Sequence, residues 1–179
     1  MTHNKIKSYA KINLALNVTG KTSKLHKIES ILGFVSLYDV IIVKKVKAAK
    51  NIISFNGKFS KNISKNNTIL KLLNILEKKK LLNNQKFKIK INKYIPPKAG
   101  LGGGSMDAAN ILKYLIKKKF IKPSKTQVIS ICKSIGSDVI LGLNSTFSIL
   151  KTNGQIKEFR NCKRLYTLII KPNYGCSTK

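Results

Sequence analysis

The feature that most constrains the fold is a glycine-rich segment at residues 99–105, AGLGGGS, which runs directly into a helical pattern. Four of five consecutive residues, 100–104, are glycine, and apolar residues then recur every three to four positions from Ala108 to Ile116. Glycine lets a backbone approach a ligand closely, and the free N–H groups at a helix N-terminus bind anions. We therefore predict a phosphate-binding loop followed by a helix, with Ser105 as N-cap and Asp107 in the first turn.

The same segment could be an ordinary glycine-rich turn between a strand and a helix, but its glycine density favours an anion site. Two common phosphate-binding loops do not fit it. No Gly-Lys-Ser/Thr follows, as a Walker loop requires, and residues 119–130 contain no acidic side chain where a Rossmann fold needs one.

The hydrophobic pattern places strands mainly before helices, which favours an α+β domain over a doubly wound sheet. Period-two and β-branched segments predict strands at residues 6–18, 28–37, 40–46, 52–55, 87–91, 146–150 and 165–170. Helical periodicity predicts helices at residues 67–80, 105–119 and 124–135. The turn signal at Asn56-Gly57 predicts a short hairpin.

The composition is strongly basic, with 36 Lys and Arg against 6 Asp and Glu and a formal charge of +30. Such a charge attracts nucleic acid or acidic membranes. The lysines are spread through every segment, however, as an A/T-biased coding sequence produces, and aromatic residues make up only 7%. We therefore expect neither specific nucleic-acid binding nor a membrane partner.

No apolar run approaches the ~18 residues of a membrane span, and the N-terminus has no signal-peptide pattern. The three cysteines, Cys132, Cys162 and Cys176, form no Cys-x-x-Cys pair, which favours reduced thiols in a bacterial cytoplasm.

Three short segments together resemble the GHMP kinases, the superfamily of galactokinase, homoserine kinase and mevalonate kinase. Residues 96–109 are similar to the family's second motif, Pro-x-x-x-Gly-Leu-Gly-x-Ser-x-Ala-Ala. Residues 10–14, AKINL, match the first motif, and residues 136–139, GSDV, match a third stretch. The triple glycine is most similar to the branch that acts on a cytidine diphosphate-linked methylerythritol in the non-mevalonate isoprenoid pathway.

The resemblance implies an ATP-dependent kinase with Mg²⁺ that phosphorylates the 2-hydroxyl of that small molecule. It implies that Lys11 and Asp138 are catalytic, with Asp138 as base, and that Asn13 and His26 bind substrate. It implies nucleotide binding by Asn67, Pro97, Lys98, Ala99, Gly100, Leu101, Gly102, Gly103, Gly104, Ser105 and Met106. Without the resemblance, the local sequence would favour ordinary roles: Asp138 would cap a turn, and Lys11 would be a solvent-exposed lysine on a strand. We predict no metal-ligand set of the protein's own.

The resemblance also predicts the fold and the domain division. We expect the GHMP-kinase N-terminal domain type, a mixed or antiparallel sheet with helices on one face, at residues 1–160. Residues 161–179 would begin a second, ferredoxin-like domain that is mostly absent from a truncated chain. A monomer or a homodimer is expected.

The sequence departs from the family pattern at two positions. Ile140 stands where the family has proline, and Leu25 stands before His26 where the family has a tyrosine that holds cytosine. Two alternatives stay open: another GHMP kinase of homoserine or mevalonate type, and a non-catalytic basic domain that binds RNA.

Overall fold

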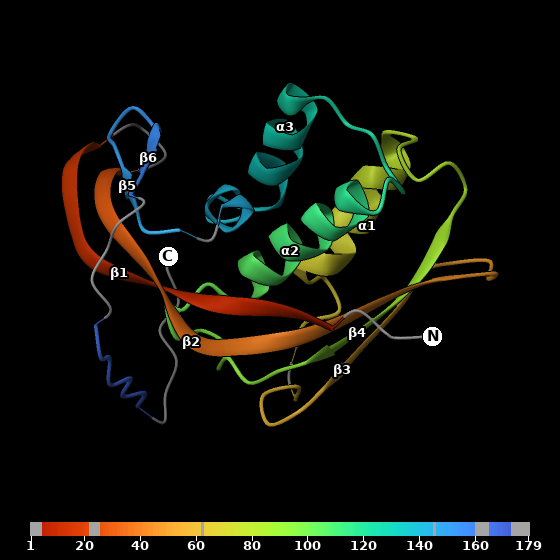
Figure 1. Cartoon of the computed structure of the whole chain (residues 1–179), viewed down its shortest axis with the longest axis horizontal. Coiled ribbons are helices and arrows are strands. Elements are labelled where there is room, and N and C mark those ends of the chain that lie inside the picture. Colours follow the sequence, from red (N-terminus) through yellow and green to blue (C-terminus); the bar gives the residue numbers. More distant parts are fainter. Residues whose placement is uncertain (1–4, 22–25, 62, 145, 160–164, 173–179) are drawn as a thin grey trace.

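A computed structural model describes residues 5–21, 26–61, 63–144, 146–159 and 165–172, in which a six-stranded sheet carries its helices on one face (Figure 1). The strands are β1 (Lys5–Lys21), β2 (His26–Val46), β3 (Ile52–Asn56), β4 (Lys86–Asn92), β5 (Ser148–Leu150) and β6 (Ile156–Glu158). The helices are α1 (Thr68–Lys78), α2 (Gly103–Lys117), α3 (Lys125–Ile135) and the 3₁₀ turn η1 (Ile140–Leu143). The predicted α+β class, with a mixed sheet and helices on one face, is confirmed.

Strand β2 is the centre of the sheet. It pairs antiparallel with β1 through residues 26–42, with β4 through residues 40–46 and with β5 through residues 30–32. The prediction of two strands at residues 28–37 and 40–46 was wrong, because the chain stays extended through Asp39. That carboxylate is fully buried and accepts hydrogen bonds, so a residue that usually disfavours strands is satisfied here.

Strand β3 pairs with β4 in parallel, so the hairpin predicted at Asn56-Gly57 is wrong. A parallel pair needs a crossover, and α1 supplies it. The turn itself exists, with Gly57 at a φ of +92°. There the chain packs on the backbone of Lys93, whose N–H donates to Asn56 O at 2.7 Å. A Cβ on Gly57 would lie 2.8 Å from Lys93 O, so glycine is required.

The core lies between the sheet and helices α1, α2 and α3. Its members are the inward-facing side chains of β2 and β4 and the apolar faces of the helices, including Ile41, Ile89, Phe87, Leu72, Leu112 and Ile131. Ser124, where the sequence predicts the start of this helix, caps α3 in a capping box with Gln127. No helix among the described residues is long and apolar enough to cross a membrane.

The strand predicted at residues 165–170 is not formed. Residues 165–172 have no regular secondary structure, and Tyr166, Leu168 and Ile170 are exposed. Apolar β-propensity without a hydrogen-bonded neighbour does not make a strand. The strand predicted at 146–150 is observed in the shorter form β5.

We predict that Gly142→Ala destabilises the domain by ~1–3 kcal/mol, because a Cβ at this position would lie 2.7 Å from Ala109 Cβ. Gly142 belongs to η1 and packs against α2. Urea unfolding of the two proteins measures the difference. Gly20→Ala is the matched control, since its Cβ would meet only Lys27, at 3.8 Å. Equal unfolding midpoints for the parent and Gly142→Ala would contradict this packing.

Candidate active site

The glycine-rich loop lines a cavity of about 410 Å³. Helix α2 begins at Gly103, two residues before the predicted start, and its N-cap is Gly102 rather than Ser105. Gly102 has a φ of 66°, a left-handed conformation that glycine adopts readily, and Met106 N already donates to Gly102 O at 2.9 Å. Ser105 therefore lies in the first turn of α2, and Asp107 lies beyond that turn, buried.

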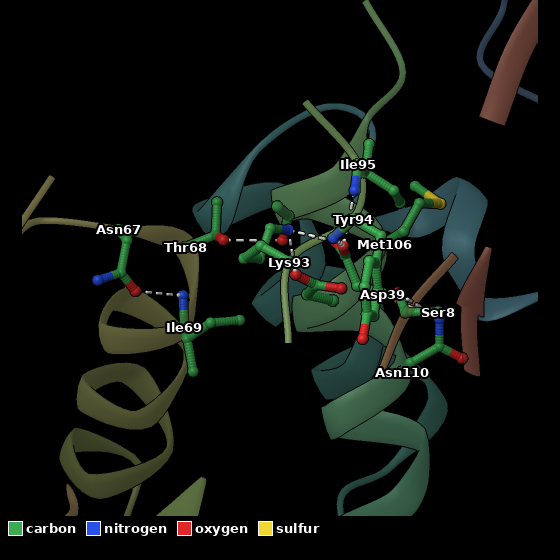
Figure 2. Close-up of polar contacts among 12 residues, drawn as sticks. Ser8, Asp39, Asn67, Thr68, Ile69, Lys93, Tyr94, Ile95, Met106 and Asn110 are labelled. Carbon is green, nitrogen blue, oxygen red and sulfur yellow. Dashed lines mark hydrogen bonds and ion pairs between the residues drawn. The ribbon is translucent and has the colours of Figure 1, made fainter. Parts of the chain in front are cut away.

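Two helix N-termini meet at this cavity. Thr68, the first residue of α1, donates from Oγ1 to Gly104 O at 2.7 Å and so ties α1 to the first turn of α2 (Figure 2). The early N–H groups of both helices have no intrahelical acceptor, and both dipoles are positive at these ends. The cavity therefore suits an anion such as a phosphate.

The nucleotide-binding residues that the sequence predicts lie mostly around this cavity. Its lining includes Asn67, Pro97, Lys98, Ala99, Gly100, Leu101, Gly102, Gly103, Gly104 and Ser105. Asn67 is also the N-cap of α1, because its Oδ1 accepts from Ile69 N and Leu70 N, each at 3.0 Å. Met106 is different: it is fully buried against Leu32 and Leu141 and does not line the cavity.

Lys11, Asn13 and Asp138 come together beside the loop. Lys11 Nζ lies 3.4 Å from Asp138 Oδ2 and donates to Asn13 Oδ1 at 2.6 Å. The Lys11 side chain is 9% exposed and that of Asp138 is 39% exposed, so the pair lies at the edge of solvent. A lysine and an amide of β1 and a carboxylate from a distant part of the chain thus form one polar group.

The loop and strand β1 are packed against each other at this point. Lys11 N donates to Leu101 O at 3.1 Å, and a Cβ on Gly102 would lie 3.0 Å from Lys11 Cγ. Ala10, Ile95 and Leu101 form a small buried cluster. Irregularities in the β1–β2 register, between Tyr9 and Lys11 and again between Asn13 and Ala15, flank Lys11 and Asn13. Such bulges re-aim side chains.

Asp138 is held by the turn that follows α3. Leu141 N donates to Asp138 O at 3.2 Å, and Val139 next to it is fully buried. Ile140, which occupies the family's proline position, is the first residue of η1. The turn places the carboxylate toward Lys11 while its neighbours anchor it in the core.

His26 is not brought to this group. It is the exposed first residue of β2 and lies opposite Lys21, at the far end of the β1–β2 hairpin. Lys11 lies ten residues along β1 from Lys21, which corresponds to about 30 Å of strand. Leu25 lies outside the described residues.

A buried ion cluster behind the loop was missed by sequence reasoning. Lys93, which follows β4, pairs with Asp39 of β2 and, at 2.8 Å, with Asp107 of α2 (Figure 2). Asp39 Oδ1 also accepts from Tyr94 N at 2.6 Å and Ile95 N at 2.9 Å. The available signal was that Asp39 and Asp107 are two of only six acids and stand in apolar surroundings.

The two carboxylates of this cluster are not equivalent. Asp39 accepts from Lys93 and from two backbone N–H groups, whereas Asp107 Oδ1 is buried without a hydrogen bond. Burial raises the pKa of Asp107 to about 7, which the Lys93 ammonium opposes only in part. Burial alone would lower the pKa of Lys93, but the Asp107 and Asp39 carboxylates outweigh it and raise that pKa.

The described residues contain no cluster of three or more His, Cys, Asp and Glu side chains that could hold a metal ion. Among the cavity-lining residues, the carboxylate is that of Asp107, and it is engaged with Lys93. The hydroxyl of Ser105 is the remaining oxygen donor of the α2 first turn.

Residues 67–151 match the family described as the GHMP kinases N terminal domain. The matched segment runs from the N-cap of α1 to just beyond β5, and so contains the loop, α2 and Asp138.

The chain is 58% identical over 175 residues to the 4-diphosphocytidyl-2-C-methyl-D-erythritol kinase of Pelagibacter ubique (strain HTCC1062), covering 98% of this chain and 62% of the relative. It is 34% identical to the enzyme of that name in Thermoanaerobacter pseudethanolicus (strain ATCC 33223 / 39E), covering 98% of this chain and 60% of the relative. The chain thus spans about three fifths of the length of these curated relatives.

A crystal structure of 4-(cytidine 5'-diphospho)-2C-methyl-D-erythritol kinase superposes with a TM-score of 0.69 at 24% identity. The superposition covers 87% of this chain and 55% of that one. At this level of identity the likeness shows the fold.

We predict that Asp107→Asn becomes progressively more stable than the parent as the pH rises from 4 to 7. The unfolded chain loses the Asp107 proton near the ordinary pKa of 3.8, whereas the folded chain keeps it up to a pH of about 7. The parent's free energy of unfolding therefore falls across this window, by ~1–4 kcal/mol from this group, and asparagine has no proton to lose.

Urea unfolding of both proteins at several pH values measures the difference. Glu158→Gln, at an exposed acid outside the cluster, serves as the control whose difference from the parent is expected to vary little. A difference between Asp107→Asn and the parent that stays constant from pH 4 to 8 would show that Asp107 is ionised throughout.

Proposed function

Because this chain belongs to the GHMP kinase family through the domain that residues 67–151 match, we propose that it provides the nucleotide-binding part and the catalytic pair of an ATP-dependent small-molecule kinase. The substrate we propose is 4-diphosphocytidyl-2-C-methyl-D-erythritol, the molecule in the names of relatives 58% and 34% identical to this chain. The phosphoryl group would go to its 2-hydroxyl. These relatives favour this substrate over homoserine or mevalonate, and a kinase over an RNA-binding domain.

The observation that carries the proposal is the contact between Lys11 and Asp138, at 3.4 Å, beside a glycine loop that lines an anion-suited cavity. Phosphoryl transfer depends mostly on positioning and on stabilising charge on the moving group. A base for the attacking hydroxyl and a cradle for the phosphates are therefore the two parts required, and they lie side by side here.

Asp138 is the proposed general base. Its carboxylate is partly exposed and hence open to a substrate hydroxyl, whose proton it would accept as the oxygen attacks the terminal phosphorus. Lys11 keeps that carboxylate oriented and offsets its charge. Asn13, bonded to Lys11 Nζ, is placed to bind the substrate alcohol next to them.

The loop from Pro97 to Ser105 and the first turns of α1 and α2 would hold the phosphates of ATP. Loop residues fit a phosphate chain because glycine leaves the backbone accessible and the helix N-termini are positive. Asn67 would contribute indirectly, by capping the N-terminus of α1 beside the phosphates. We assign Met106 a packing role, and His26, at the end of the hairpin, a role only toward the far end of the substrate.

The residues present fit a Mg²⁺ ion that would be held chiefly by phosphate oxygens and water, with the Ser105 hydroxyl as one protein oxygen within the cavity. When bound, such an ion would neutralise charge that develops during transfer. We further propose that the protein acts in the bacterial cytoplasm as a monomer or homodimer. Residues 1–160 would form the ATP-binding domain and residues 161–179 the beginning of a second one.

We predict that Asp138→Asn lowers phosphoryl transfer by ~10²–10⁴-fold while MgATP affinity changes little, because asparagine keeps the shape but cannot accept the proton. A coupled ADP assay with 4-diphosphocytidyl-2-C-methyl-D-erythritol, and calorimetric titration with MgATP, measure the two effects. Homoserine and mevalonate in the same assay test the substrate.

Glu29→Gln is the matched control, since Glu29 is an exposed acid that accepts from Thr152 and lies away from the loop. A turnover of Asp138→Asn close to that of the parent would remove Asp138 from the mechanism. Transfer to mevalonate or homoserine in preference to the cytidine-linked alcohol would overturn the substrate assignment.

A further inference from the structure

Two members of the buried ion cluster flank the phosphate loop in the sequence. Lys93 lies just before the loop and Asp107 just after it, 14 positions apart, and their side chains are joined at 2.8 Å. Asp39, from the centre of the sheet, pairs with the same ammonium. The loop between Lys93 and Asp107 is therefore closed by an ion pair that is itself anchored to β2.

We propose that Lys93, Asp39 and Asp107 are positioning residues that set the conformation of the glycine loop for phosphate binding. The proposal rests on the nucleotide site proposed above and adds the part of the protein that shapes it. None of the three side chains needs to touch the nucleotide for this purpose.

Asp39 determines how the chain enters the loop. Its Oδ1 accepts from the backbone of both Tyr94 and Ile95, the two residues that follow Lys93. The Ile95 side chain is then buried against Leu101 and Ala10. The carboxylate thus fixes the direction in which the chain leaves β4.

Asp107 determines where α2 begins relative to Lys93. A Cβ on Gly103 would lie 3.0 Å from Ile95 Cγ2 and 3.5 Å from Lys93 Nζ, so the first residue of α2 lies directly against the cluster. An ammonium next to a helix N-terminus is unfavourable by itself. The two carboxylates offset this, and the ammonium in turn holds α2 by its fifth residue.

Stability alone does not account for this arrangement. Buried ion pairs often contribute no more to stability than apolar side chains of similar volume. Here two carboxylates share one ammonium, and among the described residues no donor is within hydrogen-bonding geometry of Asp107 Oδ1. The cluster keeps an unsatisfied oxygen at the place where the loop joins α2. A role in positioning the loop relative to α2 explains this better than a contribution to stability does.

Asp107→Ala tests the proposal, because it removes the link to α2 and leaves the Lys93–Asp39 pair intact. We expect MgATP affinity to fall by about 10- to 100-fold, as for a site displaced by about 1 Å. Amide hydrogen exchange in the ligand-free protein should become about tenfold faster at Met106, whose N–H donates to Gly102 O. Asp107→Asn keeps an oxygen acceptor for Lys93 and should lose less affinity than alanine.

The matched control is Glu77→Ala, which removes a helical acid paired with Lys86 at 2.6 Å, on α1 and outside the cavity lining. It should change neither affinity nor Met106 exchange. Urea unfolding of each variant separates the two explanations: a purely structural role predicts affinity losses that follow stability losses.

Unchanged MgATP affinity and unchanged Met106 exchange in a folded Asp107→Ala variant would overturn the proposal. If that variant does not fold, Asp107→Leu decides, because leucine fills the space without an acceptor for Lys93, and Met106 exchange equal to the parent's then counts against the proposal. If the parent binds no MgATP, the proposed function fails, and the exchange measurement still decides whether the cluster sets the loop.

Discussion

The start of helix α2 is the constraint on which the rest of the site depends. Gly102 turns the chain in a left-handed conformation, and Gly103 begins the helix against Ile95 and Lys93. Farther along the helix, Ala109 lies so close to Gly142 that a larger side chain at either position would clash with the other residue. Small residues on α2 therefore allow the close approach of Ile95 and Lys93 at one end and of η1, which follows the turn that carries Asp138, farther along.

Acidic residues are scarce in this chain, and three of the six form ion pairs with lysines near the glycine loop. Of six acidic residues among 36 basic ones, Asp39 and Asp107 pair with Lys93 behind the loop, and Asp138 pairs with Lys11 beside it. In a chain of this composition most lysines are surface charges, and a lysine is distinguished by its carboxylate partner. The large positive charge is therefore a poor indicator of function, whereas these ion pairs lie beside or behind the glycine loop where we propose the site.

Sequence reasoning predicted elements whose signals are local. The periodicity of α1, the start of α3 at Ser124 and the alternation of strand β4 could all be predicted from short stretches of sequence. The hairpin at Asn56-Gly57 failed because the partner of β3 is the distant strand β4. The break within β2 failed because Tyr94 and Ile95, distant in sequence, donate to Asp39. The strand at 165–170 failed because local β-propensity alone does not make a strand. Likewise, the glycines alone predicted the loop. The role of Lys93 became visible only in the structure, where Asp39 and Asp107 pair with it.

The contact between Lys11 and Asp138 shows why the pair that we propose as catalytic was beyond physical sequence reasoning, whereas the family resemblance pointed to both residues. The two residues are 127 positions apart, and the register of β1 on β2 shifts just before Lys11 and just after Asn13. An ideal strand would keep a strict alternation, but a bulge at Ala10 lets that residue pack against Leu101 while Lys11 N bonds to Leu101 O. The first motif and the glycine loop are therefore complementary surfaces of one unit, and a change at Ala10 should disturb the loop as directly as a change in the loop itself.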